Sequence, residues 1–381
     1  MYKRQVLLSL VFILSFSIGA FGQTTLTSVV HNIHKLQSEV LGEERTILVR
    51  VPARYAYSTD KFPVTYMLDA HPPQNAMMAG ILDQQTWANQ IPEMILVGIQ
   101  NIDRLRDMTP TKTAPGGGEA DKFLRFIETE VIPLVEKTYR TEPFRVFAGH
   151  SLAGLAAINC LITRPHLFNA YIAASPVLHW DKNYVIKQAE ALFEKTPEMK
   201  KRVYFAIGNE PDYTAGFTAF RELIKKKGPK NLAWASDQFE DENHGSVVLP
   251  VYLKGLRFIF EGWLPPPVPS LAELESHYKK LSERLTYTIT IPENLLNQFG
   301  YEKLRDGQTN EAVAAFKRNV ELYPNSANAF DSLAEALEKN GQIKDARLAY
   351  ERAYKMALSS GENQLAQTAK ANYDRISTKL N

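Results

Sequence analysis

Cysteine is nearly missing from this sequence, which contains only Cys160 among its 381 residues. A single cysteine forms no disulfide within the chain, so an apolar core must hold the fold together. The hydrophobic content of 45% is sufficient for such a core. The length favours two domains over one, because a single core stops growing beyond about 250–300 residues.

The net charge of the chain is also close to zero. The chain carries 44 Lys and Arg residues against 42 Asp and Glu residues, which gives a formal charge of +2. A nucleic-acid-binding protein usually presents a basic stripe or patch, so this balance argues against nucleic acid as a partner. It fits a small substrate that is uncharged or modestly charged.

Long apolar runs are scarce, and the one near the N-terminus is short. It covers residues 6–18, follows two basic residues, and precedes the small residues Ala20 and Gly22. This order is typical of a secretory signal peptide, so we predict a signal peptide over residues 1–22 and export to the periplasm or the medium. An uncleaved signal anchor is the alternative. The absence of a later run of about 18 apolar residues argues against stable membrane insertion.

The middle of the chain has the pattern of an α/β domain with a mainly parallel sheet, predicted here over residues 24–263. Short β-rich runs alternate with stretches of helical period. Several of these runs are continuously apolar, as central strands covered on both faces should be. The predicted strands are 46–51, 64–68, 94–99, 145–148, 170–174, 203–207 and 233–238. A helix is predicted over 121–139, with a kink at Pro133.

Prolines interrupt this pattern at residues 264–269, which favours a domain boundary, because consecutive prolines continue neither a helix nor a central strand. A linker and helix over 264–292 are expected to lead into an all-α domain over 293–381. Residues at six positions of this domain each have a counterpart 34 residues later. The first set is Leu296, Gly300, Gly307, Ala312, Phe316 and Val320, and the counterparts, in the same order, are Phe330, Ala334, Gly341, Ala346, Tyr350 and Tyr354. This period resembles the tetratricopeptide repeat, which suits a protein partner or self-association. A helix over 362–380 is expected to be its polar cap.

Ser151 is the candidate nucleophile, in the run Gly149-His150-Ser151-Leu152-Ala153-Gly154 between a predicted strand and a predicted helix. A serine hydroxyl needs a base within hydrogen-bond reach and a third group that holds the base. In a tight strand-to-helix turn, small neighbours let the serine project, and the N–H of Leu152 points at the developing oxyanion. The five-residue elbow usually has glycine where this chain has Ala153. An ordinary turn is the alternative for the motif alone.

His244 is the candidate base. It follows the last predicted strand and precedes an amphipathic helix over 248–260. The histidine of an α/β-hydrolase occupies such a loop, and the chain order there is serine, acid, histidine. A surface-loop histidine is the alternative. His150 adjoins Ser151 but is expected to point away from it.

The acid is expected after the strand 203–207, where Glu210 and Asp212 both qualify. We prefer Glu210, because the following proline would fix the loop direction and leave the carboxylate free. Either residue is otherwise an exposed loop acid. The second oxyanion donor is expected to be the backbone N–H of Ala70 or His71, in the loop after the strand 64–68.

Five segments of the chain resemble the Putative esterase family of α/β-hydrolases, which includes esterase D, enterochelin esterases and carbohydrate esterases that remove feruloyl or acetyl groups. They span about residues 51–263 and are Tyr66-Met67-Leu68-Asp69, Arg106-Asp107-Met108-Thr109-Pro110, Gly149-His150-Ser151-Leu152-Ala153-Gly154, Ala174-Ser175-Pro176 with Trp180, and His244-Gly245-Ser246-Val247. The resemblance implies a serine carboxylesterase without metal or organic cofactor, with Ser151 as nucleophile and His244 as base. The chain departs from the family at Ala153 and Ala70, and the resemblance does not choose between the two acids.

Three further features are candidates for contact with the substrate. Arg106 is interpreted either as a grip for a carboxylate or phosphate or as half of a structural ion pair with Asp107. Trp180 and His71 are candidates for the pocket wall, with core packing as the alternative for Trp180. Gly116-Gly117-Gly118 is expected to be a flexible loop, because no strand leads directly into it and no Lys-Ser/Thr pair follows.

These residues predict hydrolysis of a small ester through an acyl-enzyme on Ser151. A siderophore lactone, a feruloyl or acetyl group on a polysaccharide, and a small lipid ester all fit this chemistry. The alternative is a catalytically inactive hydrolase-fold scaffold that binds partner proteins through its repeats.

Overall fold

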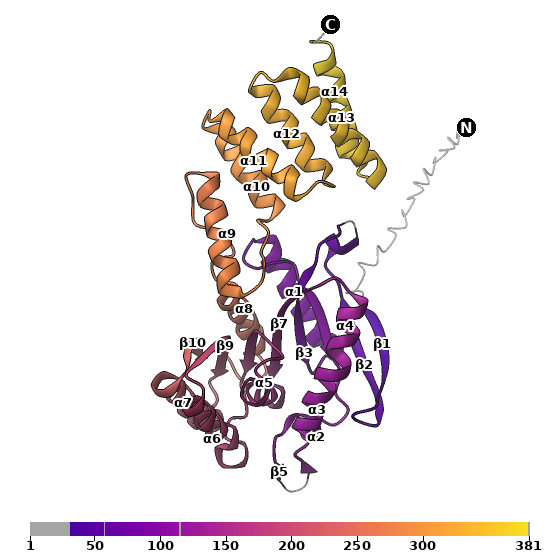
Figure 1. Ribbon diagram of the computed structural model, residues 1–381. Helices are drawn as coiled ribbons and strands as arrows, with labels where there is room; N and C mark the ends of the chain where they lie inside the picture. Colours follow the sequence, from indigo (N-terminus) through magenta and orange to yellow (C-terminus); the bar gives the residue numbers. More distant parts are fainter. Residues whose placement is uncertain (1–30, 57, 114–115, 380–381) are drawn as a thin grey trace, which may run out of the picture.

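The computed structural model describes residues 31–56, 58–113 and 116–379, so the predicted signal peptide over residues 1–22 lies outside the described residues. Figure 1 shows two parts, a sheet flanked by helices and a stack of helices beyond one end of that sheet. None of the described helices is both long enough and apolar enough to cross a membrane.

An eight-stranded sheet forms the centre of the first part, in the order β1-β2-β4-β3-β7-β8-β9-β10. Its strands are β1 (Asn32–Ser38), β2 (Glu43–Arg50), β3 (Phe62–Leu68), β4 (Ile95–Ile99), β7 (Thr141–His150), β8 (Ala170–Ala174), β9 (Glu198–Gly208) and β10 (Lys230–Phe239). The pairs β1–β2 and β2–β4 are antiparallel, and all other neighbours are parallel. All seven predicted strands are present, and the mainly parallel sheet confirms the predicted fold class.

Helices cover both faces of the sheet. One face packs against α1 (Pro72–Trp87) and α8 (Val248–Ile259), and the other against α3 (Ala120–Phe126), α4 (Ile132–Thr138), α5 (Leu152–Thr163), α6 (Trp180–Lys195) and α7 (Pro211–Lys227). Because successive strand residues face opposite sides, Met67 packs on the first face and Tyr66 on the second.

The helix predicted over 121–139 is confirmed, with an irregular centre. Helices α3 and α4 are joined by a π-helical turn over Ile127–Val131. This turn directly precedes the turn that contains Pro133, which has no N–H to close a regular helical hydrogen bond.

The second part consists of helices alone. After α9 (Leu271–Leu285) come α10 (Glu293–Arg305), α11 (Thr309–Leu322), α12 (Ala327–Lys339), α13 (Ile343–Ser360) and α14 (Asn363–Ser377). Helices α10 and α12 begin 34 residues apart, as do α11 and α13. The all-helical character of this part is as predicted, and its assignment to the tetratricopeptide repeats stays a prediction.

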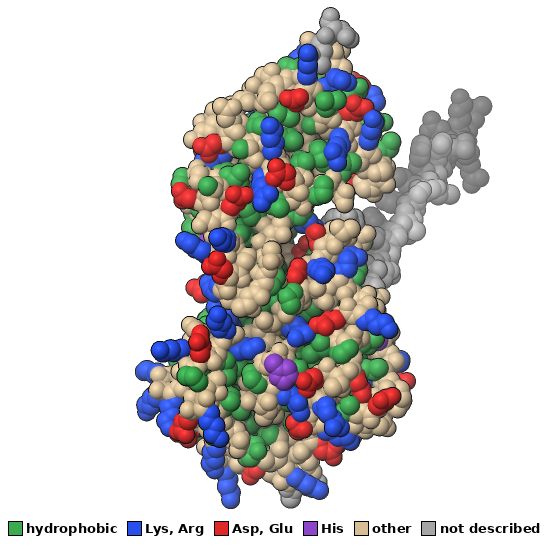
Figure 2. Space-filling model, viewed as in Figure 1, with side chains coloured by type: hydrophobic (Ala, Val, Ile, Leu, Met, Phe, Trp, Pro, Cys, Tyr) green, Lys and Arg blue, Asp and Glu red, His purple; other side chains and the backbone are tan. Residues whose placement is uncertain are grey.

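The two parts share one apolar core at the amino-terminal ends of the strands. Phe144 in β7 and Tyr287 after α9 belong to the same buried cluster, with ring centroids 5.3 Å apart. The Arg54 guanidinium lies 4.8 Å from the centre of the Tyr323 ring. The helical part therefore packs at the opposite end of the sheet from the loops that follow the carboxyl-terminal ends of the strands (Figure 1). Figure 2 shows basic and acidic side chains interspersed over both parts, in keeping with the balanced composition.

Gly255 and Gly80 allow a matched stability test, because they lie in α8 and α1 on the same sheet face. A Cβ at Gly255 would lie 2.8 Å from Cγ2 of Ile172 in β8, whereas a Cβ at Gly80 would meet nothing within 4 Å. We expect Gly255→Ala to lower the free energy of unfolding by about 1–3 kcal/mol through overpacking. Gly80→Ala should raise it by about 0.5–1 kcal/mol through helix propensity. Urea unfolding followed by circular dichroism measures both, and equal changes would contradict the close packing of α8 on β8.

Candidate active site

Ser151 occupies a sharp turn between β7 and α5. Its backbone φ is 61° and its ψ is −118°, a conformation that costs a non-glycine residue about 1–3 kcal/mol. The surrounding hydrogen bonds hold it there, because its N–H donates to the Ala174 carbonyl oxygen at 2.8 Å and its carbonyl oxygen accepts from the Leu155 N–H at 2.9 Å. A strained serine at the carboxyl-terminal edge of a parallel sheet is the geometry of a nucleophile elbow.

Small residues around Ser151 are required by close contacts. A Cβ at Gly149 would lie 2.2 Å from the Ala153 carbonyl oxygen, and a Cβ at Gly154 would lie 2.9 Å from the Ala174 carbonyl oxygen. The Ala153 side chain is completely buried without disturbing this arrangement. The elbow therefore accommodates Ala153, and Gly154 supplies the close approach of α5 to the end of β8.

The structure brings Ser151, His244 and Glu210 together from three loops at the same edge of the sheet. The Ser151 Oγ lies 3.1 Å from Nε2 of His244. Nδ1 of His244 lies 2.5 Å from Oε2 of Glu210. With the proton on Nδ1 directed at the carboxylate, Nε2 is left free to accept the serine proton. This is the order of nucleophile, base and orienting acid that acyl transfer requires.

Glu210 and Asp212 differ sharply in position. Glu210 is 6% exposed, whereas Asp212 is exposed in the first turn of α7. The Glu210 Oε1 accepts hydrogen bonds from the Ser175 Oγ at 2.5 Å and from the Gly208 N–H at 2.8 Å. Burial raises the pKa of Glu210, but the hydrogen bonds from Ser175, Gly208 and His244 outweigh it and hold this pKa below its usual value. The carboxylate that faces His244 is thus ionised.

Ser175 is a site residue to which the sequence analysis gave no role. It follows β8, is fully buried and has a φ of 41°, and its N–H donates to the Ala206 carbonyl oxygen at 2.7 Å. Only the run Ala174-Ser175-Pro176 after a buried strand could have drawn attention to it. Its hydroxyl donates to Glu210, the candidate acid.

Ser175→Ala should weaken the site through Glu210. Without the hydroxyl the pKa of Glu210 should rise, and we expect kcat at neutral pH to fall by about 3- to 10-fold, the effect of one hydrogen bond. Glu210 in its ionised form stabilises the fold above its unfolded pKa, and this contribution is lost as the pH falls through its lower folded pKa. In the variant, activity and stability should therefore decline at a higher pH than in the wild type. Rate and urea-unfolding profiles over the acid range measure both, and unchanged acid limbs would contradict the assignment.

The two sides of the expected oxyanion hole differ in the structure. Leu152 is the first residue of α5, so its N–H has no acceptor within the helix. The N–H of Ala70 donates to the Ile99 carbonyl oxygen at 3.3 Å, and the N–H of His71 donates to the Asp69 carbonyl oxygen at 2.7 Å. Leu152 is thus free of intrahelical competition, while both candidates for the second donor are engaged by backbone acceptors.

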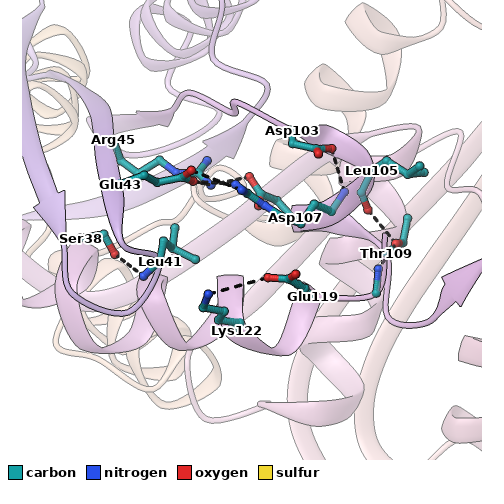
Figure 3. Close-up of polar contacts among 12 residues, drawn as sticks. Ser38, Leu41, Glu43, Arg45, Asp103, Leu105, Asp107, Thr109, Glu119 and Lys122 are labelled. Carbon is teal, nitrogen blue, oxygen red and sulfur yellow. Dashed lines mark hydrogen bonds and ion pairs between the residues drawn. The ribbon is translucent and has the colours of Figure 1, made fainter. Parts of the chain in front are cut away.

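Arg106 lies in an ion-pair network with Glu43 and Asp107. Figure 3 shows these two carboxylates close to the Arg45 guanidinium. The Arg106 Nη2 is 2.6 Å from Glu43 Oε1, and its Nε is 2.8 Å from Asp107 Oδ1. The fully buried Arg45 contributes a second guanidinium, 2.7 Å from the other Asp107 oxygen. Hydrogen bonds to Asp107 and Glu43 hold the pKa of Arg106 above its usual value. The arrangement matches the structural alternative, because Glu43 and Asp107 occupy the Arg106 guanidinium.

The remaining candidates lie around the same edge of the sheet. The Trp180 Nε1–H donates to Thr111 Oγ1 at 3.0 Å, and this half-buried ring begins α6 and packs against the core. His71 is exposed at the start of α1.

The glycines expected to form a flexible loop instead contribute β6 (Gly116–Gly117), which pairs with β5 (Lys112–Thr113) as a short hairpin. In the described part of the chain, no group of His, Cys, Asp and Glu side chains is placed to hold a metal ion.

The family model and the two relatives described next are all esterases. The model of the Putative esterase family matches residues 38–246. The chain is 29% identical over 231 residues to the ferri-bacillibactin esterase BesA of Bacillus subtilis, covering 52% of this chain and 78% of the relative. It is 41% identical over 187 residues to the siderophore triacetylfusarinine C esterase of Aspergillus fumigatus, covering 41% of this chain and 64% of the relative.

Two solved structures extend the comparison. An IroE-like serine hydrolase from Shewanella oneidensis aligns with a TM-score of 0.70 at 30% identity, covering 77% of this chain and 99% of that chain. An uncharacterised protein from Capnocytophaga ochracea aligns with a TM-score of 0.63 at 14% identity, covering 92% of this chain and 100% of that chain. The second match shows that the fold of nearly the whole chain, helical part included, recurs elsewhere.

Proposed function

We propose that this chain, which belongs to the Putative esterase family and is a carboxylic ester hydrolase, cleaves the ester bonds of siderophores by nucleophilic catalysis at Ser151. The observation that carries the proposal is the hydrogen-bonded series from Ser151 through His244 to Glu210. The siderophore substrate is supported by the names of two relatives, one that acts on ferri-bacillibactin and one that acts on triacetylfusarinine C.

In the proposed reaction, His244 takes the proton of Ser151 as the serine oxygen attacks the ester carbonyl carbon. Glu210 holds the His244 imidazole in orientation and stabilises the positive charge that the imidazole gains with the proton. The Leu152 N–H donates to the oxyanion of the tetrahedral intermediate. His244 then gives its proton to the leaving alcohol, which departs and leaves an acyl group on Ser151. Water, activated by His244, releases the acid and restores the serine.

The proposal includes the organisation expected from the sequence: a signal peptide and export, a hydrolase domain over 24–263, a linker and helix over 264–292, and tetratricopeptide repeats over 293–381. The 34-residue offset between the starts of α10 and α12 supports the repeats. The alternative of an inactive scaffold gains no support from the comparisons, and the serine, base and acid in hydrogen-bond contact oppose it.

A panel of esters tests the substrate class. We expect kcat/KM for ferri-bacillibactin or for triacetylfusarinine C to exceed that for the unactivated esters methyl ferulate and ethyl acetate by at least about tenfold, because a larger substrate offers more binding energy to the transition state. Liquid chromatography with mass spectrometry measures the released acids. A preference for the feruloyl or acetyl ester would refute the siderophore assignment and leave the esterase chemistry standing. Hydrolysis of no ester in the panel would refute both.

A further inference from the structure

His150 is the last residue of β7 and lies directly before Ser151, yet the proposed reaction gives it no role. Its half-buried ring is 4.6 Å from the ring of His244, centre to centre. Its Nε2 lies 2.8 Å from the backbone carbonyl oxygen of His244. The strand that carries the nucleophile thus contacts the backbone of the residue proposed as the base.

The loop that carries His244 is held mainly by short-range contacts. The Asn243 Oδ1 accepts from the N–H groups of Gly245 and Ser246 at 2.9 and 3.1 Å, and the Asn243 carbonyl oxygen accepts from the Val247 N–H at 3.0 Å. These bonds shape the loop but do not fix it relative to Ser151. Among the described residues, the Asn209 N–H anchors the neighbouring Glu242 carbonyl oxygen at 2.7 Å. The bond from His150 acts on the peptide of His244 itself.

The protonation of His150 suits this contact. Burial and the neighbouring His244 lower the pKa of His150 to about 4, and the other charged groups that face it are Asp69 and Arg104. Because a carbonyl oxygen only accepts, the proton of the neutral ring is on Nε2. An uncharged neighbour also leaves His244 free to become positive during the reaction, whereas a second positive charge at this distance would oppose it.

We propose that His150 is a positioning residue, whose Nε2–H donates to the His244 carbonyl oxygen and thereby fixes the base in register with Ser151. The inference rests on the proposed function, since it deepens the account of that same site. His150 takes no part in the proposed proton transfers and acts through the placement of His244. It couples the Ser151 turn to the His244 loop. Among the described residues, that loop is also held from the side of β9 by the Asn209–Glu242 hydrogen bond, and the Tyr213 ring lies 4.7 Å from the His244 ring, centre to centre.

Two variants of equal side-chain length separate the hydrogen bond from the volume of the ring. H150Q keeps an N–H donor at about the distance of Nε2, whereas H150M has none. For p-nitrophenyl acetate we expect H150M to lower kcat by about 10- to 100-fold with KM changed less than about threefold, because small displacements of a catalytic group cost about that much. H150Q should stay within about threefold of the wild type. Equal rates for the two variants, whether high or low, would overturn the proposal.

Hydrogen exchange of the loop amides gives a readout that needs no activity. We expect the backbone amides of residues 243–247 to exchange faster in H150M than in the wild type and in H150Q, as measured by mass spectrometry on the intact folded chain. Identical exchange in all three proteins would overturn the positioning role even if the enzyme is active. The two proposals can fail separately. If exchange is faster in H150M alone, but ester hydrolysis by the wild type does not depend on Ser151, the proposed function is refuted and the anchoring contact is still established.

Discussion

Replacing Ser151 by alanine is expected to lower kcat for ester hydrolysis by about 10⁴- to 10⁶-fold, the usual cost of removing a catalytic serine. The elbow geometry does not depend on the hydroxyl, because the backbone of residue 151 is held by the Ala174 carbonyl oxygen and the Leu155 N–H. The variant should therefore fold normally and lose only the nucleophile. Initial rates with p-nitrophenyl acetate and covalent labelling by a fluorophosphonate probe measure the effect.

The matched control is Ser359→Ala, an exposed serine in α13 of the helical part. It should keep both the rate and the labelling of the wild type. If Ser151→Ala hydrolysed the ester at the wild-type rate, the nucleophile would have to be another residue. If the probe still attached to Ser151→Ala, the labelled site would have to lie elsewhere.

The second large effect is expected at Glu210, for which the chain provides its own control two residues away. Glu210→Gln should lower kcat by about 10³- to 10⁴-fold, because the amide no longer favours the tautomer in which Nε2 of His244 accepts the serine proton. Asp212→Asn should change kcat by less than about twofold, since an exposed carboxylate away from His244 contributes little. KM should change little in either variant, because neither side chain is proposed to bind the ester.

The paired substitution decides between the two acids that the sequence left open. Near-equal losses for the two variants, or a larger loss for Asp212→Asn, would contradict the hydrogen bond between His244 Nδ1 and Glu210 Oε2 as the orienting contact. Circular dichroism and the urea midpoint check that Glu210→Gln remains folded, because its partners Ser175 and Gly208 are buried with it.

The sheet was predictable because its central strands are recognisable from their own residues. Strands such as β4 (Ile95–Ile99) and β8 (Ala170–Ala174) are buried along their whole length, and a short, fully apolar run is what such strands require. β1 (Asn32–Ser38) escaped prediction because it lies at the edge and most of its side chains are exposed or half-buried. An edge strand is defined by its pairing with β2, which is a contact that composition does not reveal.

The nucleophile and the base followed from local sequence, while the contacts around them required the fold. Ser151 lies in a turn whose neighbours must be small, and His244 follows the last strand, so both carry a positional signal. Glu210 and Asp212 differ only in whether they precede or follow the start of α7, which turns one inward and the other to solvent. The bond from Ser175 to Glu210 and the ion pair between Arg106 and Glu43 join elements distant in the chain, so only three-dimensional pairing identifies them.

The helical part packs at the amino-terminal ends of the strands, whereas Ser151 lies where β7 ends. This division has a practical use for enzyme immobilisation. A tag fused after α14 would be carried by the end of the molecule remote from Ser151, so a bead or electrode attached there would not obstruct the entry of bulky esters. The shared core around Phe144 and Tyr287 makes the same helices unsuitable for removal, because cutting the chain before them would expose apolar surface to water.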